Sequence, residues 1–134
     1  NPELAQAYVN EMLGETMQAA IADGAKIVPI IGMPPVTTNH PERYVDQIFE
    51  EVLTVFSQAD TLTTSLQDWR KGRRAEIQEV NGWVIDTLKA HGRTAPINQR
   101  VVDLAYEIEA NTLEAKPENA ALLIETYAAS IPAG

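Results

Sequence analysis

Prolines and glycines divide this sequence into segments whose apolar residues recur at steps of three and four, the spacing of one face of an α-helix. Prolines stand where such segments begin, because the fixed φ of proline fits the first helical turn. These prolines are Pro2, Pro41, Pro96 and Pro117. Glycines stand where segments end, because glycine tolerates the positive φ with which a chain leaves a helix. These glycines are Gly24, Gly72 and Gly92.

The segments predict an all-α fold, a compact bundle of five or six helices. Helices are expected over residues 2–23, 41–58, 65–71 and 76–91, and two more begin at Pro96 and Pro117. The second of them is the most clearly amphipathic, with Val45, Ile48 and Val52 on one face. No segment alternates with period two for long enough to predict a strand, and residues 26–31 are the sole candidate for one.

Residues 25–39 interrupt this series of helices. They contain Pro29, Pro34 and Pro35 together with Gly32, which excludes a regular helix. Connections of this length in a compact domain are usually lids, binding loops or mobile segments. The sequence leaves these three roles open.

The length of 134 residues, with 45% hydrophobic residues, predicts a single domain over residues 1–134. The chain has no cysteine, which favours a reducing compartment. It has neither an apolar run of about 18 residues nor the layout of a signal peptide, so we expect a cytoplasmic protein that does not enter a membrane. Because the sequence opens on Asn1 rather than methionine, we expect it to be part of a longer protein.

The net charge of −9 argues against binding to nucleic acid, whose phosphates attract basic surfaces. Within this acidic chain there is one basic cluster, which consists of Arg70, Lys71, Arg73 and Arg74. It has two interpretations, a solvated helix end or a contact for an anion.

Several catalytic and binding motifs are missing from the sequence. No Gly-x-Gly pair or P-loop is present, so this chain should not bind a dinucleotide in the manner of a Rossmann fold. The two histidines, His40 and His91, are far apart and there is no cysteine, so we expect no metal site. No serine lies in a Gly-x-Ser-x-Gly turn, which leaves nothing in favour of a hydrolase.

Glu76 is the most informative acidic residue. Val80 and Trp83 follow it at four and seven residues, which places Glu76 at the edge of an apolar helix face. A partly desolvated carboxylate there would suit proton transfer or a hydrogen bond to a substrate hydroxyl. The alternative is that glutamate is simply favoured in a first helical turn by the helix dipole.

Short motifs with a joint spacing surround Glu76. They are SLQD at 65–68, RRAEI at 73–77, VNG at 80–82 and HGRTAPIN at 91–98, with NPEL at 1–4 upstream. In these motifs the sequence resembles the C-terminal domain of the ketopantoate reductase family, also called 2-dehydropantoate 2-reductases. The family's motifs are close to S-M-L-Q-D, R-x-T-E-I, N-G, H-G-x-x-x-P-x-N and D-P-E-L.

The resemblance implies an NADPH-dependent reduction of a 2-oxo acid, most narrowly of ketopantoate to pantoate in pantothenate biosynthesis. It implies a helical domain like the C-terminal domain of 6-phosphogluconate dehydrogenase, which closes the substrate cleft against an N-terminal Rossmann domain that holds most of the NADPH. Glu76 matches the family glutamate that contacts the substrate hydroxyl and supports catalysis. Thr64 falls where the family has a substrate-binding serine, and Ser65, its neighbour, could take that role instead.

The sequence departs from the family in three respects. The family's catalytic lysine and its substrate-binding asparagines lie on a helix before the position of Asn1. Ala75 replaces a threonine, which removes a capping hydroxyl worth about 1 kcal/mol. The 25–39 loop is longer than usual. Because the preceding helix packs within the family's bundle, we expect an apolar face that another copy or another chain covers. We predict a homodimer, in which the two copies could exchange elements.

Two other hypotheses remain open at this point. The chain could be a helical dimerisation or interaction module without catalysis, or it could serve a reductase for a different 2-oxo acid. A role for Glu76 in the rate would separate an enzyme from an interaction module.

Overall fold

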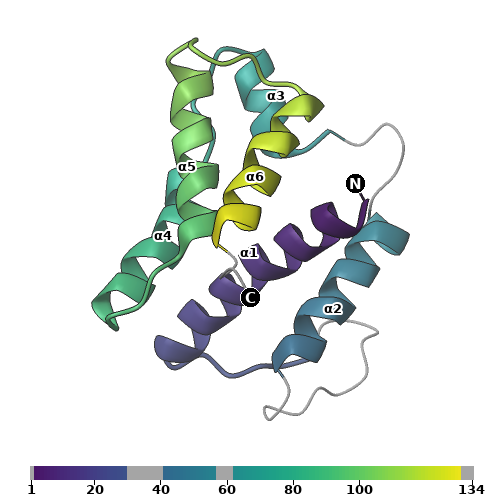
Figure 1. The fold of residues 1–134 in the computed structure, drawn as a ribbon, viewed down its shortest axis with the longest axis vertical. Helices are drawn as coiled ribbons and strands as arrows, with labels where there is room; N and C mark the ends of the chain where they lie inside the picture. Colours follow the sequence, from purple (N-terminus) through teal and green to yellow (C-terminus); the bar gives the residue numbers. More distant parts are fainter. Residues whose placement is uncertain (1, 30–40, 57–61, 131–134) are drawn as a thin grey trace.

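A computed structural model describes residues 2–29, 41–56 and 62–130 of the chain, and these residues form helices and connecting turns with no strand (Figure 1). The elements in chain order are α1 (Pro2–Ala22), α2 (Pro41–Glu51), the π-helix η1 (Val52–Phe56), α3 (Thr64–Arg70), α4 (Ile77–Ala90), α5 (Pro96–Glu109), the 3₁₀-helix η2 (Pro117–Asn119) and α6 (Ala120–Ser130). The prediction of an all-α domain is confirmed. Of the strand candidate, residues 26–29 are not a strand, and residues 30 and 31 lie outside the described residues.

The boundaries of the helices agree with the signals in the sequence, with two differences. Gly24, Gly72 and Gly92 each follow a helix with φ between 66° and 86°, as expected of glycines that end helices. The second helix does not continue in α-form as predicted but changes to a π-helix at Val52. Glu76 lies at the N-cap of α4 rather than in its first turn.

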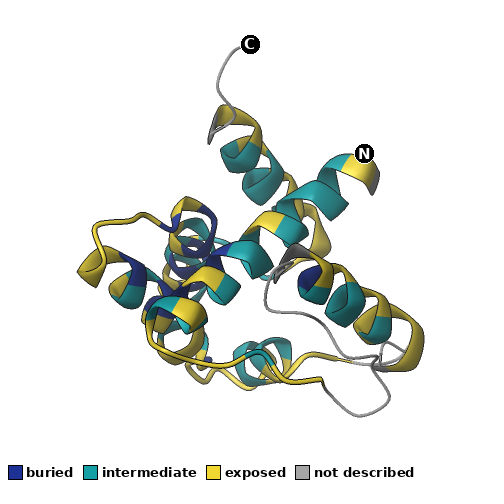
Figure 2. Cartoon of the chain, turned by 90° about the horizontal axis from the view of Figure 1, so that it is seen from below, coloured by how far each residue is buried: buried dark blue, intermediate teal, exposed yellow. Residues whose placement is uncertain are grey.

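The core lies where α1, α4 and α5 meet, and the buried residues gather there (Figure 2). It is built from Ala19 of α1, Val84 and Leu88 of α4, and Ile97 and Val102 of α5. Burying such side chains contributes roughly 25 cal/mol for each Å² of apolar surface removed from water. α2 packs mainly on α1, at the side of the molecule away from α4 and α5 (Figure 1).

A buried carboxylate joins these three helices. Glu15 of α1 is only 3% exposed, and its two oxygens accept hydrogen bonds from the backbone N–H groups of Ile97, at 3.0 Å, and Asn98, at 2.9 Å. The Asn98 amide also donates to Glu15 at 2.6 Å and to the Met12 carbonyl at 3.1 Å. Asn81 of α4 donates to the Asn98 side-chain oxygen at 2.8 Å.

Glu15 therefore supplies the cap that α5 lacks locally. Ala95, at the N-cap of α5, has no side chain that could accept from the first N–H groups of that helix. A carboxylate fills this role well, because the N-terminus of a helix carries the positive end of its dipole.

We expect Glu15→Ala to lower the free energy of unfolding by about 3 kcal/mol, since two buried backbone N–H groups lose their acceptor. Urea unfolding of the 134-residue chain measures this change. Glu11→Ala, an exposed glutamate on the same helix, is the matched control and should change stability by less than about 0.5 kcal/mol. Equal effects of the two substitutions would contradict the capping role.

Candidate active site

The three residues predicted for the site lie at the N-terminal ends of two helices. Thr64 and Ser65 stand in the first turn of α3, and Glu76 stands at the N-cap of α4. Thr64 and Glu76 are exposed, and Ser65 is half-buried. Among the described residues, these side chains form no hydrogen bond or ion pair, with one another or with a third group. All three are therefore available to a ligand, and the structure shows no direct contact between Glu76 and either hydroxyl.

Glu76 takes part in its helix through its backbone alone. Its carbonyl accepts from the Val80 N–H at 3.1 Å, while its carboxylate caps nothing. The expected partial desolvation is not found in this chain. Val80 is 61% exposed and Trp83 is 40% exposed, so the apolar stripe beside Glu76 faces outward. The expectation was wrong because helical spacing shows which residues share a face but not whether anything packs on it.

Glu109 fixes the connection that leads to Glu76. One of its oxygens accepts from the backbone N–H of Ala75 at 3.0 Å and from the indole N–H of Trp69 at 3.3 Å. Ala75 is only 2% exposed, so its N–H has little access to water as an alternative partner. The last residue of α5 thus holds the end of α3 and the residue immediately before Glu76. The bond at Ala75 also secures the position where the resemblance implied a missing capping hydroxyl.

Sequence reasoning did not single out Glu109, although one signal was present. Glutamate in the last turn of a helix faces the negative end of the dipole, which disfavours a carboxylate there. α5 ends on Glu109 and has no basic residue in its last turn. A residue placed against this preference indicates a tertiary partner, here Trp69 and Ala75.

The basic cluster predicted from the sequence divides into two kinds of residue. Arg73 pairs with Asp68 at 3.1 Å, and Arg74 pairs with Glu79 at 2.8 Å. The hydrogen bond from Arg74 lowers the pKa of Glu79 and raises the pKa of Arg74. Arg70 and Lys71 form no side-chain hydrogen bond or ion pair with any described residue. Arg73 and Arg74 thus fit the first interpretation, because both form exposed ion pairs. Arg70 fits the second, because its side chain remains available for contact with an anion.

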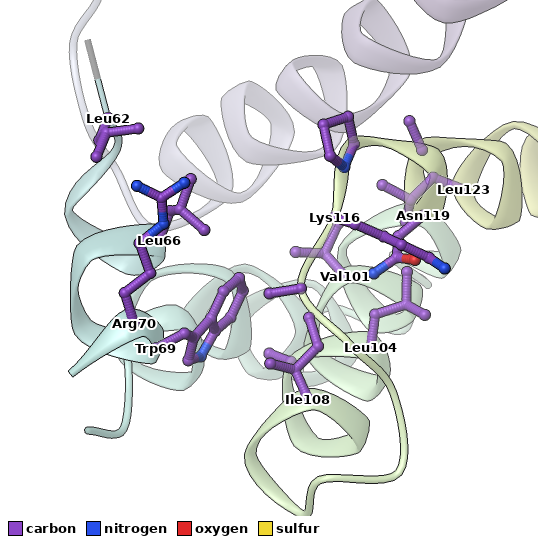
Figure 3. A pocket seen from close by; sticks show the side chains of 14 residues that line it. Leu62, Leu66, Trp69, Arg70, Val101, Leu104, Ile108, Lys116, Asn119 and Leu123 are labelled. Carbon is purple, nitrogen blue, oxygen red and sulfur yellow. The ribbon is translucent and has the colours of Figure 1, made fainter. Parts of the chain in front are cut away.

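A groove of about 540 Å³ lies between α3, α5 and α6 (Figure 3). Neither Glu76, Thr64 nor Ser65 lines it. A smaller hollow of about 220 Å³ lies beside the connection between α3 and α4 and is lined by Arg73, Arg74 and Glu109 among others. Neither of these two hollows thus contains the predicted site residues.

Two further findings concern the described residues as a whole. No group of three His, Asp or Glu side chains in residues 2–29, 41–56 and 62–130 is placed to hold a metal ion. No described helix combines the length and the apolar character needed to cross a membrane.

We expect Glu109→Ala to destabilise the domain by about 2 kcal/mol, because the buried N–H of Ala75 loses its acceptor. Amide hydrogen exchange should show the loss locally, as faster exchange at Ala75 than in the unaltered domain. Glu107→Ala removes a neighbouring glutamate whose partner is the half-buried Arg100, and should leave Ala75 unaffected. Unchanged protection of Ala75 in Glu109→Ala would contradict the role of Glu109.

Comparison with known proteins identifies the family. The family model described as ketopantoate reductase PanE/ApbA C terminal matches residues 1–109, which end with α5. No curated protein and no solved structure matches the chain. The match covers most of the chain, including Glu76, Thr64 and Ser65. The chain therefore belongs to the ketopantoate reductase PanE/ApbA C-terminal domain family.

Proposed function

We propose that this chain is the substrate-side domain of an NADPH-dependent 2-oxo acid reductase, with ketopantoate as the substrate and pantoate as the product. The observation that carries the proposal is the free carboxylate of Glu76 within the family's motif. The family match supports the reaction class, and the available side chains of Glu76, Thr64 and Ser65 support a role in substrate binding. The proposed location is the cytoplasm.

The reaction adds a hydride to the C2 carbonyl carbon of the substrate and a proton to its oxygen. The resemblance assigns the donation of this proton to the family's lysine, which precedes the position of Asn1. NADPH, when bound, supplies the hydride. In our proposal, the Glu76 carboxylate accepts a hydrogen bond from the hydroxyl that the substrate carries. The hydroxyl of Thr64 or Ser65 donates a second hydrogen bond, and the two contacts together orient the carbonyl for reduction.

The residues of this domain are consistent with substrate contacts here and cofactor binding in another domain. The chain has no Gly-x-Gly phosphate loop, so the greater part of the cofactor would be held by the N-terminal Rossmann domain that full-length members of the family contain. Glu76, Val80 and Trp83 are exposed along one edge of α4. A second domain can therefore reach Glu76 without any rearrangement of α4.

We expect Glu76→Gln to lower kcat/KM for ketopantoate about 100-fold in the intact protein, measured as NADPH oxidation, because the amide cannot act as an anionic acceptor. In the same assay, loss of the hydroxyl that binds the substrate, in Thr64→Val or Ser65→Ala, should raise KM about tenfold.

Glu79→Gln is the matched control, since Glu79 is one turn away and already paired with Arg74. It should keep near-normal turnover. If the protein reduces only a bulkier 2-oxo acid, the proposed reaction class is correct and the proposed substrate, ketopantoate, is wrong. Absence of oxidation with every 2-oxo acid, in a protein that still binds a partner, would favour the interaction module. Full activity of Glu76→Gln would contradict the role given to Glu76.

The domain is also proposed to form a homodimer. The support is an exposed apolar patch on η1 made of Val52, Leu53 and Val55.

Sedimentation of the 134-residue chain should give the mass of a dimer, and Val55→Glu should shift it towards the monomer, because a charge would be buried at the contact. Lys89→Glu, an exposed position on α4, serves as the control for added negative charge. A monomer mass at every concentration would contradict the homodimer.

A further inference from the structure

The groove between α3, α5 and α6 has walls that are mainly apolar. One wall comes from α3, the floor from α5, and the other wall from η2 and α6 (Figure 3). The apolar side chains that line it include Leu66, Trp69, Leu104, Ile108 and Leu123. A volume of about 540 Å³ lies within the range of pockets that bind small organic molecules.

Two cations stand on opposite walls of this groove. Arg70 belongs to the α3 wall and Lys116 to the opposite wall (Figure 3). Neither side chain forms a hydrogen bond or ion pair within the part of the chain that the structure describes. Glu114 lines an adjoining hollow together with Arg70, yet no ion pair joins them. The groove therefore offers two unneutralised positive charges beside an apolar surface.

Among the described residues, Arg70 and Lys116 share the lack of an acidic partner with Lys71 and Lys89, and differ from them in lining an apolar groove. The chain carries 19 acidic and 10 basic residues, and the neighbouring cations Arg73 and Arg74 both have acidic partners. Apart from the two cations, the polar side chain that lines the groove is Asn119, which carries no negative charge. Asn119 donates its amide to the Glu114 carbonyl at 2.7 Å. The positive charges of Arg70 and Lys116 are thus complementary to a bound anion.

The groove does not include the candidate site residues, although Leu62 and Leu66, on either side of Thr64 and Ser65 in the chain, line it. Its second wall, from Ala115 to Leu123, lies beyond residue 109, where the family match ends. The residues that form the groove are therefore independent of the proposed function.

We propose that this groove binds a free amphipathic carboxylate, a small molecule with an apolar chain or ring and one carboxylate. The apolar part would lie among Leu66, Trp69 and Leu123. The carboxylate would lie at the mouth of the groove, attracted by the positive charges of Arg70 and Lys116. Charge-assisted contacts to these cations distinguish such a ligand from an uncharged one of the same shape.

The test uses decanoate as the probe and Trp69 as the reporter. The chain has two tryptophans, so Trp83→Phe leaves Trp69 as the only source of indole fluorescence. We expect decanoate, below its micelle concentration, to change this fluorescence saturably. Decanol, which lacks the charge, should bind about tenfold more weakly, and acetate, which lacks the apolar chain, should give no change.

Variants of the groove provide the second arm. Arg70→Ala and Lys116→Ala should each raise the Kd for decanoate about fivefold. Ala120→Trp places a large side chain on an exposed wall position and should abolish binding, with folding checked by circular dichroism. Lys71→Ala is the matched control, because Lys71 is the adjacent unpaired cation and does not line the groove.

Several results would overturn the proposal. These are a lack of saturable binding, equal Kd values for decanoate and decanol, or equal weakening by Lys71→Ala and Arg70→Ala. Loss of decanoate binding in the intact protein would show that another part of that protein occupies the groove. If the protein sediments with phosphatidylglycerol vesicles but does not respond to free decanoate, the groove is part of a membrane-binding surface instead.

Discussion

The hydrogen bonds between Glu15 and the start of α5 connect the helices that form the core of this domain. Glu15 belongs to α1, and it accepts from the first N–H groups of α5 and from the side chain of Asn98, which in turn binds Asn81 of α4. A buried carboxylate is tolerated only where its charge is compensated, and here a helix N-terminus and three donors compensate it. This network of Glu15, Asn98 and Asn81 therefore joins all three core helices.

α5 transmits this constraint to the candidate site. It is a helix of 14 residues and therefore about 20 Å long, with Glu15 bound near one end and Glu109 at the other. Because a helix of this length moves as a unit, the anchor at Ile97 and Asn98 also places Glu109. Glu109 then holds Ala75, and Glu76 follows directly in the chain. The position of the proposed substrate contact thus depends on a bond at the opposite end of α5.

The sequence was sufficient to predict the helices but not the contacts between them. Prolines and glycines marked most helix ends, because their preferences are local properties of the backbone. The bonds of Glu15 and Glu109 join residues more than thirty positions apart, and no local pattern reports them. Helical spacing likewise did not predict the exposure of Val80 and Trp83, because it does not report what packs on a helix face. The motif around Glu76 was found by resemblance, which the spacing of residues alone would not have supplied.

The way α2 is attached has a consequence for how such a domain can diverge. α2 packs mainly on α1, and only Val45 among its described side chains is buried. A change in chain length ahead of α2 would therefore displace one peripheral helix and leave the bonds of Glu15 and Glu109 intact. Insertions and deletions between α1 and α2 thus have little thermodynamic cost for the rest of the fold. This junction can accumulate variation while the geometry around Glu76 stays constant.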